Sequence, residues 1–152
     1  MPVIHVHDKQ FQPYISQEQI AGKIQEIAFA LEKDYSGKTP LFIAVLNGSF
    51  MFASDLFKAL NMPAEICFIK LASYKGTQSS GHIITSIGLD IDLFGRDVII
   101  LEDIIDTGKT MSQFLPQLLH QQPASLKICT LLHKPQAAIY PVTIDYYGFI
   151  IS

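Results

Sequence analysis

The sequence of 152 residues has few charged side chains, since Asp, Glu, Lys and Arg together make up only 16% of it. Its eleven Lys and Arg residues are scattered, and the net charge is -3. A nucleic-acid surface requires a concentrated basic footprint, so we expect no nucleic-acid partner. Hydrophobic residues make up 49% of the chain. That proportion favours a sheet buried on both faces over a disordered or fibrous chain.

Cysteines and long hydrophobic runs are also scarce. The two cysteines, Cys67 and Cys129, lie inside apolar runs and are predicted to be buried free thiols, with no disulfide scaffold and no zinc site. The N-terminus lacks the apolar core of a signal peptide, and no apolar run approaches the roughly 18 residues that cross a bilayer. We therefore expect a cytoplasmic protein with no membrane partner.

The chain shows no internal repeat, no low-complexity stretch and no obvious linker. Its length suits one domain with a real hydrophobic core, so residues 1–152 are predicted to form a single domain.

Helical and strand patterns alternate along the chain. Ser16 and Gln19 form a capping-box pattern ahead of apolar residues at helical spacing. A short helix is predicted around Phe52, Leu56 and Leu60, ending before Pro63, and another at about 110–121. Strands are predicted at 41–46, 65–71, 98–101, 126–132 and 144–150. Residues 72–85 contain little to bury and are predicted to form a mobile loop or a long hairpin connection. This alternation predicts an α/β fold with a mainly parallel twisted sheet flanked by helices.

The central segment, residues 98–111, carries the clearest chemical signal. Its apolar run ends in Glu102 and Asp103, and Asp106 follows just before Thr107-Gly108-Lys109-Thr110. Ligands of a parallel sheet lie beyond the carboxyl ends of its strands. A glycine, two hydroxyl side chains and the start of a helix can surround phosphate oxygens there. Acidic residues beside such a loop suit a phosphorylated sugar, whose hydroxyls need acceptors.

Gly108-Lys109-Thr110 also matches the last part of a Walker loop. That motif requires a second glycine five residues before Gly108, and the position is occupied by Asp103. A nucleotide hydrolase of that kind is therefore excluded.

The segment Leu-Glu-Asp-Ile-Ile-Asp-Thr-Gly-Lys-Thr resembles the phosphoribosyl-pyrophosphate signature of type I phosphoribosyltransferases, and of their hypoxanthine-guanine branch in particular. Three other stretches resemble that family in the same order. They are Val45 to Phe52, similar to a pyrophosphate-binding loop; Leu71 to Gly81, similar to a mobile catalytic loop; and Leu131 to Pro135, similar to a purine-reading strand end. The resemblance runs from about His5 to the end of the chain.

The resemblance implies transfer of a 5-phosphoribosyl group from phosphoribosyl pyrophosphate to hypoxanthine or guanine, with Mg²⁺ as cofactor. Glu102 and Asp103 would hold the ribose hydroxyls and, through one of them, magnesium. The implied roles of the other residues are 5′-phosphate binding by Thr107, Gly108, Lys109 and Thr110, proton exchange with the base by Asp106, recognition of the six-position oxygen by Lys134, pyrophosphate binding by Asn47 and Gly48, and closure over the reaction by Ser73 and Tyr74.

Two departures from the family pattern affect these expectations. Asn47 stands where the family often has lysine, so pyrophosphate binding should depend more on magnesium. Members of the family also continue for some tens of residues beyond the position that matches Ser152. We therefore expect the C-terminal part of the fold to be missing from this chain and the base site to be only half formed.

The sequence thus predicts a purine-salvage enzyme that assembles as a homodimer or homotetramer. One alternative is a non-catalytic regulator on the same fold that senses the donor or nucleotides. Another keeps the chemistry and takes xanthine or a pyrimidine as acceptor. Lys134 favours a six-oxo purine but does not rank hypoxanthine, guanine and xanthine.

Overall fold

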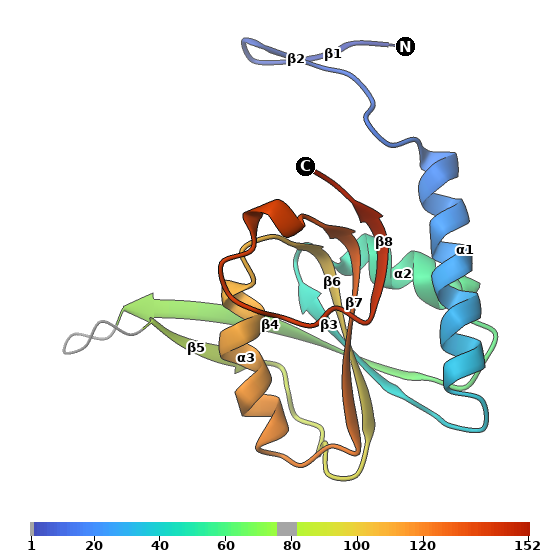
Figure 1. Ribbon diagram of the computed structural model, residues 1–152, viewed down its shortest axis with the longest axis vertical. Helices are drawn as coiled ribbons and strands as arrows, with labels where there is room; N and C mark the ends of the chain where they lie inside the picture. Colours follow the sequence, from blue (N-terminus) through green and yellow to red (C-terminus); the bar gives the residue numbers. More distant parts are fainter. Residues whose placement is uncertain (1, 76–81) are drawn as a thin grey trace.

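A six-stranded sheet with helices on both faces forms the body of the protein in the computed structural model, which describes residues 2–75 and 82–152 (Figure 1). The strand order is β5-β4-β3-β6-β7-β8. The elements are β1 (Ile4–Val6), β2 (Lys9–Phe11), α1 (Gln17–Asp34), β3 (Leu41–Leu46), α2 (Phe50–Ala59), β4 (Glu65–Lys75), β5 (His82–Ile87), β6 (Asp97–Ile105), α3 (Lys109–Leu119), β7 (Ser125–His133), the 3₁₀ turn η1 (Pro135–Ala137) and β8 (Tyr146–Ile150).

The predicted fold class is confirmed. Strands β4, β3, β6, β7 and β8 are parallel, and β5 pairs antiparallel with β4 at one edge of the sheet. Parallel neighbours need crossover connections, and α2 and α3 supply two of them, from β3 to β4 and from β6 to β7. The carboxyl ends of β3, β6 and β7 consequently lie at the same edge of the sheet.

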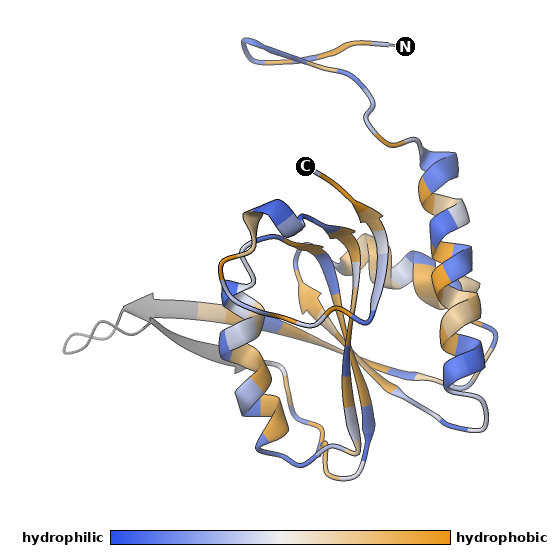
Figure 2. Ribbon diagram, viewed as in Figure 1, coloured by the Kyte–Doolittle hydropathy of each residue, from blue (hydrophilic) through white to orange (hydrophobic). Residues whose placement is uncertain are grey.

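Two hydrophobic layers enclose the sheet. Helices α1 and α2 pack on one face, against residues such as Phe42 and Leu101, and α3 packs on the other, against Ile43 and Ile100. Strand β3 is apolar throughout because both of its faces are buried. Figure 2 shows the hydrophobic colour concentrated on the central strands and on the inner sides of the helices.

Helix α1 begins at the predicted capping box. The Gln19 N–H donates to Ser16 Oγ at 3.1 Å, and the Ser16 N–H donates to Gln19 Oε1 at 2.8 Å. Each side chain thereby satisfies a backbone group that the helix start leaves without a partner. The two cysteines are free and buried, also as predicted.

Several element boundaries differ from the sequence prediction. Strand β6 continues to Ile105 instead of ending at Leu101, because Glu102, Ile104 and Ile105 pair with β7. Residues 72–75 and 82–85 of the segment 72–85 belong to β4 and β5, which pair antiparallel, and its residues 76–81 lie outside the described part of the chain. Long-range pairing fixes these boundaries, and local sequence carries little signal of it.

A small hairpin of β1 and β2 precedes α1 and was not predicted. It stands apart from the sheet and helices, as Figure 1 shows, and all six of its strand residues are exposed. Within the described ranges, no helix combines the length and the hydrophobicity needed to cross a membrane.

Candidate active site

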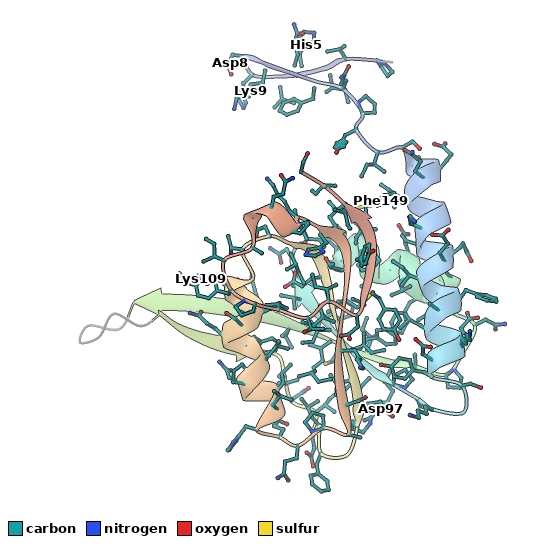
Figure 3. The ribbon with its side chains drawn as sticks, in the orientation of Figure 1. His5, Asp8, Lys9, Asp97, Lys109 and Phe149 are labelled. Atoms are coloured by element: carbon teal, nitrogen blue, oxygen red, sulfur yellow. The ribbon has the colours of Figure 1, made fainter. Side chains whose placement is uncertain are left out.

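The carboxyl edge of the sheet brings three of the four predicted segments together. Strand β6 lies between β3 and β7, with Ala44 opposite Leu101 and Ile105 opposite His133. The chain leaves this edge at Asn47 after β3, at Asp106 after β6 and at Lys134 after β7. In Figure 3, Lys109 lies at the start of α3, whereas Asp97, the first residue of β6, lies at the opposite end of the strand.

Gly48 and Asp103 are in direct contact. A β-carbon on residue 48 would stand 2.5 Å from Asp103 Oδ2 and 2.7 Å from its Cγ. Any larger residue at position 48 would therefore displace the Asp103 carboxylate. The neighbouring Ser49 is buried, and its hydroxyl donates to the Val45 carbonyl at 2.6 Å, which closes the turn after β3. The predicted pyrophosphate loop thus rests on one of the two predicted ribose-binding carboxylates.

The Glu102 side chain shares a hydrogen bond with that of Asp103. It lines a cavity of about 120 Å³ at the start of α3, together with Ile104, Asp106, Lys109 and others. Burial raises the pKa of Glu102 from 4.5 to about 8, and the negative charges of Asp103 and Asp106 add to the increase. A cation or a hydroxyl donor bound in this cavity would offset the free-energy cost of ionising Glu102.

The loop from Asp106 to Thr110 has the local structure of an anion-binding turn. The Thr107 N–H donates to Asp106 Oδ1 at 2.7 Å, and the Lys109 N–H donates to Thr107 Oγ1 at 3.3 Å. Gly108 precedes α3 with φ +82°, in the left-handed region that glycine tolerates. The N-cap residue Gly108 has no side chain to cap the helix, so the first-turn N–H groups that follow the Lys109 N–H can face an anion.

Lys134 lies beside this loop at the end of β7. Its backbone N–H donates to the Ile105 carbonyl at 2.9 Å, so Lys134 and Asp106 leave the sheet on neighbouring strands. The lysine is half-buried. Both predicted base-contacting residues therefore occupy one corner of the site.

Ser73 and Tyr74 belong to β4, where they pair through the backbone with Ile84 and Ile83 of β5. Their side chains, and residues 76–81 of the predicted catalytic loop, lie outside the part of the chain that the structure describes. Their predicted role in closure stays a prediction.

Sequence reasoning missed two features of the site. Ile104 is 37% exposed and lines the Glu102 cavity, although it belongs to an apolar strand. Its position two residues after Glu102 is the signal, since strand alternation puts both on one face. Tyr140 and Val142 lie against Gly108 from the connection between β7 and β8. No local pattern marks that contact.

The carboxylates offer a partial metal site. Among the described residues, no group of three His, Cys, Asp or Glu side chains could hold a metal ion without further ligands. Magnesium is commonly held by one or two carboxylates together with substrate oxygens and water. Glu102 and Asp103 fit that arrangement.

Comparison with known proteins agrees with this geometry. Residues 14–152 match the phosphoribosyl transferase domain model. The chain is 43% identical over 138 residues to the hypoxanthine-guanine-xanthine phosphoribosyltransferase of Tritrichomonas foetus, and 41% identical to the hypoxanthine-guanine phosphoribosyltransferase of Lactococcus lactis. Each match covers 90% of this chain and 75% of the relative.

Solved structures are similar over most of their length. The hypoxanthine-guanine phosphoribosyltransferase of Bacillus anthracis superposes with a TM-score of 0.83 at 37% identity, covering 93% of this chain and 82% of that one. A hypoxanthine phosphoribosyltransferase of Trypanosoma cruzi superposes with a TM-score of 0.83 at 30% identity, covering 97% of this chain and 82% of that one. That structure concerns the role of the C-terminal region in oligomeric state and enzymatic activity. The chain therefore belongs to the phosphoribosyltransferase family of enzymes.

Proposed function

We propose that the protein transfers the 5-phosphoribosyl group of phosphoribosyl pyrophosphate to hypoxanthine or guanine, forming IMP or GMP and releasing pyrophosphate. The observation that carries this proposal is the order of groups at one sheet edge. Strand β6 presents Glu102 and Asp103 and leads directly into the anion loop, with the Asn47–Gly48 turn on one side and Lys134 on the other.

The donor would bind across this edge with its groups in the order of the residues. Thr107, Gly108, Lys109 and Thr110 would hold the 5′-phosphate through backbone N–H groups and hydroxyls. Glu102 and Asp103 would accept hydrogen bonds from the ribose hydroxyls. Asn47 and Gly48 would meet the pyrophosphate, and the contact of Gly48 with Asp103 supports a pyrophosphate position beside the ribose.

Magnesium would be held by Glu102 or Asp103 together with oxygens of the donor. When bound, it neutralises charge on the pyrophosphate as that group leaves. Two neighbouring carboxylates, one of which resists ionisation because it is buried, favour such a cation.

The reaction breaks the bond between the anomeric carbon and pyrophosphate oxygen and forms a bond from that carbon to a purine nitrogen. Positive charge develops on the ribose, and the carboxylates of Glu102 and Asp103 stabilise it more in the transition state than in the ground state. Asp106 would exchange a proton with the base, and the Lys134 ammonium would donate to its six-position oxygen. Ser73 and Tyr74 would help to exclude water.

Xanthine is a second candidate acceptor. The relative from Tritrichomonas foetus is a hypoxanthine-guanine-xanthine phosphoribosyltransferase, whereas that from Lactococcus lactis acts on hypoxanthine and guanine. Lys134 would serve all three bases, because each carries a six-position oxygen. Competition among the three bases for one limiting donor would rank them.

A homodimer or homotetramer in the cytoplasm completes the proposal. The study of oligomeric state in the Trypanosoma cruzi relative supports assembly. Two free, buried cysteines suit a reducing compartment.

The test is formation of IMP or GMP from phosphoribosyl pyrophosphate, Mg²⁺ and hypoxanthine or guanine, followed by chromatography of the nucleotide product. We expect Asp106→Asn to lower kcat by about 10²-fold, a typical contribution of acid–base catalysis. The matched control is Asp55→Asn, an exposed carboxylate on α2 paired with Lys58. Donor binding without any nucleotide product would reject the enzyme and favour the regulator.

A further inference from the structure

The phosphate loop is attached on its outer side to the connection between β7 and β8. The backbone N–H groups of Ile139 and Tyr140 both donate to the Thr107 carbonyl, at 3.0 and 2.9 Å. We call residues 138–142 the strap. A carbonyl that accepts two hydrogen bonds is held in one orientation, and the peptide plane that it shares with the Gly108 N–H is held with it.

The strap also packs against the loop. At Gly108, a β-carbon would stand 2.5 Å from the Tyr140 carbonyl oxygen and 3.1 Å from Val142 Cγ2. Val142 packs in turn on the hydrophobic core beneath α3. The strap thus connects the phosphate loop to the hydrophobic core, because Val142 contacts both.

An open cavity adjoins the strap. A cavity of about 380 Å³ lies between the strap and the ends of β6 and β7, lined by Asp106, Gly108, His133, Tyr140, Val142 and others. Because this space is not filled by side chains, the strap is attached to the loop through its contacts with Thr107 and Gly108. Loss of the packing of Val142 or Tyr140 against Gly108 should therefore move the loop.

We propose that the strap positions the phosphate loop for donor binding and that Tyr140 and Val142 are positioning residues. The inference rests on the proposed function for its substrate, because it assigns the loop to the 5′-phosphate of the donor. Backbone N–H groups stabilise an anion only when they are already oriented toward it. Neither Tyr140 nor Val142 needs to touch the substrate.

Val142→Ala tests the proposal, because it removes the methyl groups that lie against Gly108. Amide hydrogen exchange of residues 106–112, with β3 as internal reference, should become faster in the free protein. The KM for the donor should rise about fivefold, while the KM for the base and kcat stay close to wild type. Val142→Ile keeps the contact with Gly108, so the exchange rate of residues 106–112 and the donor KM should both stay close to wild type. Ile139→Ala is the matched control, because its side chain is 73% exposed and its backbone N–H is retained.

Uniformly faster exchange across the protein with an unchanged donor KM would mean general destabilisation and would overturn the proposal. Unchanged exchange in residues 106–112 would overturn it as well. The exchange measurement does not depend on catalysis. Local loosening of the loop in a protein that forms no nucleotide would therefore support the strap while rejecting the proposed function.

Discussion

At the scale of single residues, the site depends on close contacts between groups far apart in the sequence. Gly48 follows β3, Asp103 lies in β6, and the two touch. Glu102 and Asp103 are adjacent in sequence, and their side chains share a hydrogen bond. The pKa of Glu102 therefore depends on the neighbouring negative charge as well as on burial.

Gly48→Ala should disturb donor binding. The added β-carbon would overlap the Asp103 carboxylate, so that side chain must move away from the ribose. We expect the donor KM to rise about tenfold, equivalent to roughly 1.4 kcal/mol of lost binding, with little change in the KM for the base. Gly22→Ala is the control, since nothing lies within 4 Å of a β-carbon there. Equal donor KM values for both variants would contradict the predicted role of this contact.

The pKa of Glu102 predicts how stability depends on pH. Burial raises that pKa from 4.5 to about 8. Between these values the folded state keeps a proton that the unfolded state has lost, so raising the pH across this window lowers the free energy of unfolding. In Glu102→Gln the side chain at this position cannot ionise, so the free energy of unfolding should fall less steeply as the pH rises. Urea titrations at a series of pH values, without divalent ions or substrates, measure the slopes, and identical slopes for the two proteins would refute the assignment.

At the scale of elements, local signals were reliable where a helix or strand depends on its own residues. The Ser16–Gln19 capping box was predicted and is present. The apolar run of β3 was also placed correctly. By contrast, the ends of β6 and the existence of β5 depend on pairing with another strand, which the local pattern did not reveal.

Ser16→Ala should destabilise the protein through α1 alone. It removes the hydrogen bond that the Gln19 N–H donates to the serine hydroxyl, while the backbone N–H of residue 16 can still donate to Gln19 Oε1. The expected loss is about 1 kcal/mol in the free energy of unfolding, measured by urea denaturation. Ser54→Ala, at an exposed position inside α2, should leave stability unchanged or slightly higher. A loss of the same size in both variants would argue against a capping effect.

At the scale of the whole molecule, the parallel sheet explains how three distant segments form one site. Crossover connections return the chain to the same edge, so residues near 48, 103 and 134 converge although they are separated by more than 80 positions at the extremes. The N-terminal hairpin contributes nothing to this convergence, because it stands away from the sheet.

The sequence by itself determined the fold class, most of the helices and strands, and the segment that contains the anion loop. These features follow from hydrophobic periodicity, capping residues and the order of residue types along one strand. Tertiary structure decided the rest. It extended β6 through Glu102 to Ile105, placed Asp103 on Gly48 and Glu102 in a cavity, and set the strap against Gly108. The physical reason is that strand pairing and close backbone contact join residues far apart in the chain, so no local pattern specifies them.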